Sequence, residues 1–208
     1  MSDQNHMANQ QNPHAAHEAH EAHEAPTTTV TDEDLRELLG HALHGEVITY
    51  FVKETGEERA YVERQVAECL RYLYLVSKYR DRLSGLFLPV EQAIDEIWHY
   101  LILQTREYVA LCEDRLPGRY FIHHRSIAYE DYQAEPGREQ AAEEALRWIP
   151  LYCREFGPFD EGALPHWTIV RYLHQHMDMP LDEISALEPL EPNDPAAPNT
   201  PAEPIGAA

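Results

Sequence analysis

The side chains best suited to metal binding or proton transfer gather in residues 94–124, which read IDEIWHYLILQTREYVALCEDRLPGRYFIHH. Imidazole, carboxylate and thiolate groups bind transition metals and transfer protons. This stretch contains all three kinds, and their spacing decides which of them can act together. The residues concerned are Asp95, Trp98, His99, Tyr108, Cys112, His123 and His124.

Helical geometry separates the cysteine from the first histidine. If residues 89–115 form one α-helix, Cys112 lies ~20 Å along the axis from His99 and about 140° around it. The two side chains then cannot bind the same ion. Cys112 instead falls on an apolar face, as expected for the core side of an amphipathic helix. That face consists of Val90, Ile94, Ile97, Trp98, Leu101, Ile102, Thr105, Tyr108, Val109 and Cys112.

Asp95 and His99 lie on the other face of this helix. Asp95 precedes His99 by four residues, so its carboxylate can reach the imidazole. Such a pair can be two metal ligands, a histidine ligand with a supporting carboxylate, or a proton-transfer dyad. It can also be an ordinary solvated charge pair.

His123 and His124 could join this pair from the segment that follows the helix. An extended chain from Leu116 to His124 spans up to ~27 Å, and the helix from Leu116 back to His99 is about 25 Å long. His124 can just reach His99 and His123 is at the limit, although contact with the ends of other helices is the simpler expectation. Adjacent residues of an extended segment point to opposite sides, so at most one of them should face the site.

Other histidines form weaker candidate sites. His174, His176, Met177 and Met179 combine nitrogen and thioether donors, which suit copper, although histidines at a helix end also interact with its carbonyl groups. The histidine pair at 41 and 44 could supply a further ligand, but nothing in the sequence places it against residues 89–115.

The N-terminal stretch HAAHEAHEAHEAP repeats histidine every third residue, at His14, His17, His20 and His23. Imidazoles beside carboxylates can collect Zn, Ni or Cu ions. The alternative is a disordered extension that keeps the chain soluble.

The composition limits the classes of partner. The formal net charge is −21, with 37 acidic residues against 16 Lys and Arg. Such a polyanion is repelled by phosphate backbones and anionic lipids, so we expect neither nucleic-acid nor membrane binding. The three cysteines have no disulfide-framework spacing, and no apolar stretch approaches the length of a membrane span. A cytoplasmic protein is therefore predicted.

The periodicity predicts an all-α protein with a single domain, at residues 31–185, of about five helices. The first starts at Thr31, a favourable N-cap, and continues to residue 43. The others are expected at residues 57–83, 89–115, 138–149 and 165–177, with Pro150 bounding the fourth. Residues 1–30 are predicted to be a disordered His-rich tail and residues 186–208 a disordered, Pro-rich acidic tail, and these tails could recruit a protein partner.

Residues 70–125 resemble the glycine-rich domain-containing protein-like family of bacteria and plants. The matching residues are Asp95, Trp98, His99, Thr105, Tyr108, Cys112, Gly118, Phe121, His123 and His124. The chain departs from that pattern at two positions. Leu101 stands where plant members often have a second histidine, and Arg125 stands where the family pattern has a proline after the histidines. The resemblance brings no biochemical role with it.

Together these features favour a protein that binds a divalent transition metal through Asp95, His99 and one of His123 or His124. Zn or Fe is the first expectation, and Cu or Ni are further candidates. One alternative is an enzyme on the same site, either a hydrolase with Asp95 or Glu96 as base or a non-haem Fe oxygenase. Another is a non-catalytic interaction module that works through its tails.

Overall fold

Most of the part of the chain that the structure describes is helical. The computed structural model describes residues 29–83, 88, 90–124 and 138–189, with side chains from residue 145 in the last range. These residues form nine α-helices, and an isolated β-bridge joins Val90 to Trp167. The predicted all-α class is confirmed for them. The proposed tails lie outside the described residues apart from their inner ends, 29–30 and 186–189.

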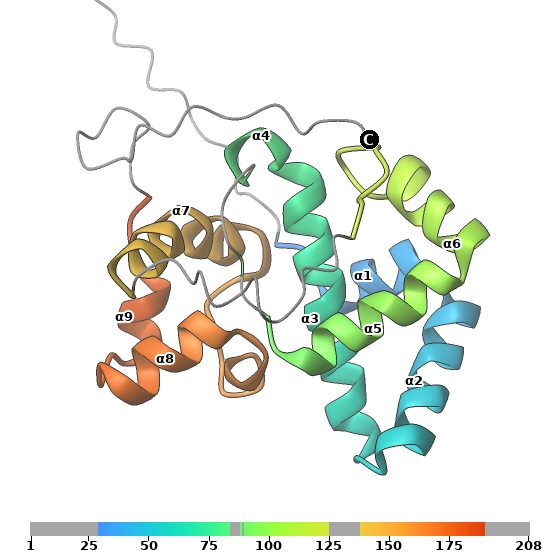
Figure 1. Ribbon diagram of the computed structural model, residues 1–208, viewed down its shortest axis with the longest axis horizontal. Helices are drawn as coiled ribbons and strands as arrows, with labels where there is room; N and C mark the ends of the chain where they lie inside the picture. The colour runs from blue at the N-terminus through green and yellow to red at the C-terminus, as the bar shows by residue number, and fades with distance from the viewer. Residues whose placement is uncertain (1–28, 84–87, 89, 125–137, 190–208) are drawn as a thin grey trace, which may run out of the picture.

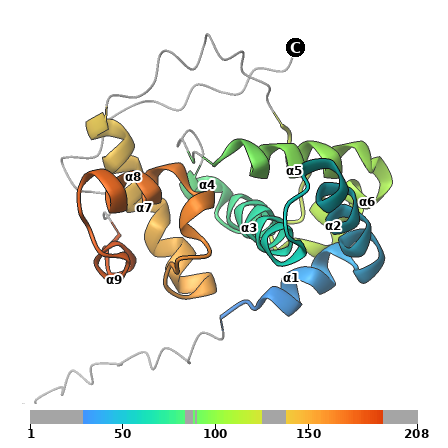
Figure 2. The same cartoon turned by 90° about the horizontal axis from the view of Figure 1, so that it is seen from below.

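Helix α3 (Arg59–Lys78) runs through the middle of the molecule, with helices on both sides of it (Figures 1 and 2). On one side lie α1 (Asp32–Leu39), α2 (His41–Thr55), α5 (Gln92–Leu103) and α6 (Thr105–Ala110). On the other lie α7 (Arg138–Phe156), α8 (Thr168–His176) and α9 (Leu181–Ser185). Shorter pieces are α4 (Arg80–Leu83), a π-helical turn (Leu111–Arg115) and a 3-10 turn (Leu164–His166). No described helix combines the length and apolarity needed to cross a bilayer.

The central position of α3 follows from its composition, because most of its side chains are buried. Val66 and Leu70 pack into the cluster formed with α1, α2, α5 and α6. Leu75, nearer its C-terminal end, belongs to a second cluster around Trp148 and Trp167, whose rings stack with centroids 4.8 Å apart. The helix thus joins two apolar cores, which continuous burial on several faces allows.

A buried carboxylate connects the two cores. Glu68 on α3 is fully buried, and its Oε2 accepts hydrogen bonds from Tyr152 (3.0 Å) and from the Trp167 indole (2.9 Å). Its Oε1 lies 2.8 Å from Nη1 of Arg71 and 2.9 Å from Nε of Arg64. Burial alone would lower the pKa of Arg71. The neighbouring Tyr152 and Glu68 raise this pKa by more than burial lowers it, so the guanidinium stays charged. Partners on both sides therefore compensate the buried charge of Glu68.

The expected count of about five helices is wrong, mainly because three predicted helices, at 31–43, 57–83 and 89–115, are interrupted. Thr31 does cap the first, since its hydroxyl accepts from the Asp34 amide and the Asp34 carboxylate accepts from the Thr31 amide. Gly40, at φ +89°, then ends that helix, and α2 starts one residue later. A positive φ is accessible to glycine at little cost, so this position breaks what the apolar pattern presents as continuous.

The predicted helix at 89–115 is interrupted at Gln104 (ψ +57°), which separates α5 from α6. A single helical wheel therefore fails beyond that point. Trp98, Tyr108 and Cys112 are buried as predicted, but Thr105 is exposed and Val109 is 41% exposed. The change in backbone direction turns Thr105 and Val109 of the predicted core face towards solvent, while Tyr108 and Cys112 stay buried.

The C-terminal half differs from the prediction at one helix boundary and by one additional helix. Pro150 lies inside α7 rather than at its end. A proline there removes one helical hydrogen bond, at a typical cost of ~3 kcal/mol. The residues around it, Trp148, Ile149, Leu151 and Tyr152, are all buried, and this packing offsets the cost. The short helix α9 was not expected, and it covers the second core through Ile184.

Residues 116–124 run back from the π-turn towards α5 and pack against the end of α3 (Figure 1). The Gly118 amide donates to the Ser77 hydroxyl (2.9 Å), and the Tyr120 hydroxyl donates to the Val76 carbonyl (2.6 Å). A Cβ atom at Gly118 would lie 2.1 Å from the Ser77 carbonyl oxygen. Only glycine therefore allows this close approach.

Gly118→Ala is expected to destabilise the protein by about 1–3 kcal/mol, because backbone on both sides must move to admit the methyl group. The matched control is Gly45→Ala within α2, where an added Cβ meets nothing within 4 Å. That change should stabilise by about 0.5–1 kcal/mol. Urea unfolding of both variants measures the difference, and a Gly118→Ala protein as stable as the wild type would disprove the tight contact.

Candidate metal centre

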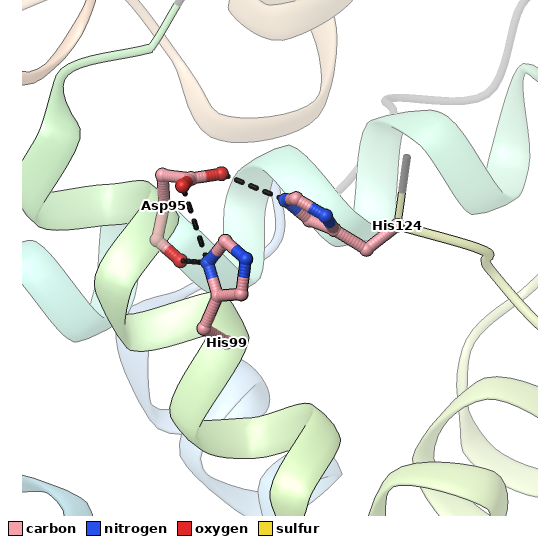
Figure 3. A group of neighbouring side chains, drawn as sticks. All are labelled: Asp95, His99 and His124. Carbon is pink, nitrogen blue, oxygen red and sulfur yellow. Dashed lines mark hydrogen bonds and ion pairs between the residues drawn. The ribbon is translucent and has the colours of Figure 1, made fainter. Parts of the chain in front are cut away.

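Helix α5 carries two of the three side chains that form the candidate site (Figure 3). Asp95 and His99 are one turn apart, and Oδ2 of Asp95 lies 3.1 Å from Nδ1 of His99. Their side chains are 43% and 47% exposed. The pair therefore lies at the surface, whereas Trp98 on the same helix is buried, as the sequence predicts.

The third side chain, His124, comes from the end of the returning segment. Its Nε2 lies 2.8 Å from Oδ1 of Asp95, and its ring centroid is 4.1 Å from that of His99. The His124 side chain is only 12% exposed, because it packs edge-on against the Trp98 indole at 4.4 Å. The simpler expectation, that His124 meets the end of another helix, is therefore wrong.

His123 takes no part in this arrangement. It is exposed, and its ring packs against Phe121, with centroids 4.8 Å apart. Successive residues of an extended segment alternate in direction, which explains why one histidine of the pair faces α5 and the other does not. The structure thus separates two residues that the sequence alone could not distinguish.

The geometry suits a metal ion. Asp95, His99 and His124 each offer one ligand atom, and these atoms lie within 4.8 Å of one another. Two atoms bound to one Zn or Fe ion at ~2.0–2.2 Å stand ~3.0–3.5 Å apart. The 2.8 Å between Oδ1 of Asp95 and Nε2 of His124 is close to that range. An ion could therefore be held with small side-chain movements.

The hydrogen bonds indicate which nitrogen atoms would bind. Nδ1 of His99 lies 2.8 Å from the backbone carbonyl of Asp95, and a carbonyl can only accept. In the neutral ring Nδ1 therefore carries the proton, and the lone pair of Nε2 is left for a metal. Figure 3 shows this second nitrogen on the side that faces His124. Nε2 of His124 faces a carboxylate, so an ion there would displace its proton and binding would weaken in acid.

A second group with suitable donors consists of Glu33, Glu37 and His41. The sequence signal for this group is the spacing of four residues between successive members. All three are exposed, and Glu33 already forms an ion pair with Arg36. This group lacks the partly buried ligand that distinguishes the site at Asp95.

The other residues considered for metal binding in the sequence lie elsewhere. Cys112 is fully buried, and burial raises the pKa of its thiol, which disfavours the thiolate that metals require. Nδ1 of His174 lies 2.9 Å from the Met179 carbonyl oxygen. The Met177 side chain is exposed, whereas His176 packs against Tyr172. The tail histidines lie outside the described residues.

Among the described residues, the side chains of Asp95 and His99 are open to solvent. Five hollows among the described residues, of about 330 to 590 Å³, are all lined by residues other than Asp95, His99 and His124. The enzyme hypothesis predicts an enclosed cavity beside His99. The exposure of Asp95 and His99 instead describes a site at the protein surface.

Comparison of the chain with known protein families, with curated proteins and with solved structures finds no match. The resemblance to the glycine-rich domain-containing protein-like family therefore stays a prediction.

Proposed function

We propose that this protein binds one divalent transition-metal ion through Asp95, His99 and His124. The observation that carries the proposal is the convergence of three potential ligand atoms from two separate segments, α5 and the end of the returning chain. Asp95 lies between the two imidazoles and contacts both. In an ordinary surface ion pair one carboxylate contacts one cation. Here the Asp95 carboxylate contacts two imidazoles, each of which could also bind a metal.

The donor set narrows the kind of ion. Two imidazole nitrogens and one carboxylate oxygen suit Zn, Fe, Ni or Cu, while Ca and Mg prefer oxygen ligands throughout. The His99 ring also donates Nδ1–H to a carbonyl, the supporting bond that metal-bound histidines usually make. Zn or Fe(II) is the first choice, and the acidic chain would attract either.

A bound ion would fasten the returning segment to α5, because His124 and the other two ligands belong to different elements. The first role that we propose is therefore metal binding that secures this part of the fold. Three protein ligands also leave coordination positions free, as in catalytic sites. That ligand count favours a metal-dependent hydrolase or Fe oxygenase as the second candidate, and an open surface argues against it.

The test separates this site from the His-rich N-terminal stretch. Full-length protein without a purification tag is prepared with the five N-terminal histidines replaced by alanine, both with and without His99→Ala. These five are His6, His14, His17, His20 and His23. Elemental analysis should find about one ion per chain in the first protein and almost none in the second. Circular dichroism checks that both are folded, and equal metal contents would refute the proposal.

A further inference from the structure

A buried hydroxyl group links the core of α5 to the segment that carries His124. The Tyr108 hydroxyl accepts a hydrogen bond from the Trp98 indole (2.8 Å) and donates one to the Ile122 carbonyl (2.7 Å). Tyr108 is only 2% exposed, and burial raises the pKa of its hydroxyl, so the group remains a donor. Trp98 and Tyr108 had been predicted only as core residues.

Ile122 lies two residues before His124 on an extended stretch of chain, so the two side chains point to the same side. The Ile122 side chain is buried at 4% exposure, and His124 is also directed inwards, whereas His123 between them is exposed. Holding the Ile122 carbonyl therefore fixes the alternation that turns His124 towards Asp95.

The Trp98 indole has two roles in this arrangement. Its Nε1–H orients the Tyr108 oxygen, and its ring packs against the His124 imidazole at 4.4 Å. His124 is thus restrained both through its backbone and at its ring. The other two ligands need no such help, because the helical backbone of α5 already fixes their separation.

We propose that Tyr108 is a positioning residue of the metal site, whose hydroxyl sets the affinity for the ion by holding the Ile122–His124 backbone in the binding arrangement. This inference rests on the proposed function. His124 is the ligand with the largest conformational freedom to lose, because it lies at the end of a non-helical segment. A ligand that is held in place before the ion arrives binds with a smaller entropic cost.

The test is Tyr108→Phe, which removes the hydroxyl and keeps the ring. Its matched control is Tyr120→Phe. Tyr120 lies in the segment that carries His124, and its hydroxyl also donates to a backbone carbonyl, that of Val76 on α3. Zn affinity is measured by competition with a chromophoric chelator, in full-length chains whose five N-terminal histidines are alanine. Removing a supporting group of this kind typically weakens metal binding 10–100-fold. We expect about a 10-fold loss for Tyr108→Phe and less than about a 3-fold loss for Tyr120→Phe.

A spectroscopic measurement distinguishes positioning from ligation. At saturating Co(II), the visible spectrum of Tyr108→Phe should match that of the wild type, because the ligands are the same. Trp98→Phe serves as a second variant if Tyr108→Phe does not fold, and it should also weaken binding. Unchanged affinity in Tyr108→Phe, or an equal loss in Tyr120→Phe, would overturn the inference. Wild-type protein that binds no metal would instead refute the proposed function.

Discussion

Replacing His124 with alanine is expected to lower Zn affinity by more than about 100-fold, beyond the usual effect of removing a supporting group. The change removes one of three ligands and leaves Asp95 and His99, which lie one turn apart on a single helix. Two adjacent surface ligands bind an ion weakly, whereas the third closes the site from a different segment. His123→Ala is the matched control, because it removes a neighbouring imidazole that is exposed and faces away.

The measurement is a chelator-competition titration on chains whose five N-terminal histidines are alanine. His123→Ala should remain within about 3-fold of the parent protein, since no ligand is lost. A loss shared equally by the two variants would mean that the twin histidines bind metal together or act through local charge. In either case the assignment of His124 as the third ligand would be wrong.

The second large effect concerns the buried carboxylate that joins the two cores. Glu68→Gln is expected to destabilise the protein by about 3–5 kcal/mol, the typical cost of removing one partner of a buried ion pair. The amide would leave the positive charge of Arg71 uncompensated on that side. It would also turn an NH₂ group towards donors, because Arg71, Tyr152 and Trp167 all donate hydrogen bonds to this carboxylate.

Urea unfolding followed by tryptophan fluorescence measures this loss, since Trp167 contacts Glu68 directly. The control is Glu63→Gln on the same helix. Glu63 pairs with Arg59 across one exposed turn (2.8 Å), and such surface pairs are worth about 0–1 kcal/mol. Similar midpoints for the two variants would show that the Glu68 network does not hold the cores together.

The local features of the site follow from the sequence because they depend on helical geometry alone. Asp95 and His99 fall on one face at a spacing of four residues, and Trp98 falls on the neighbouring, buried face. The capped start at Thr31 likewise depends on neighbouring residues only. These predictions required no knowledge of how distant segments pack.

The position of His124 could not be predicted in the same way. It depends on the break at Gln104, on the π-turn after α6, and on the close approach of Gly118 to Ser77. Each is a tertiary feature that the apolar periodicity does not encode. Extended reach alone left His123 and His124 as alternatives, and the hydrogen bond from Tyr108 to Ile122 distinguishes them.

Pro150 is a second feature whose structural context could not be predicted from the sequence. Its residue type favours a helix end, but the neighbouring Trp148 and Tyr152 are buried in the second core, and α7 continues through it. Local preference is small beside the burial of two large aromatic side chains. Sequence patterns therefore predicted the class of fold and one face of the site, and tertiary packing completed both.

The most direct test of the central claim is a crystal structure of the zinc-loaded protein with an anomalous difference map at the zinc absorption edge. The proposed site predicts one peak within ~2.0–2.2 Å of a carboxylate oxygen of Asp95 and of one nitrogen each of His99 and His124. An Asp95–His99–His124 cluster with no peak, in crystals that bind zinc elsewhere, would contradict it.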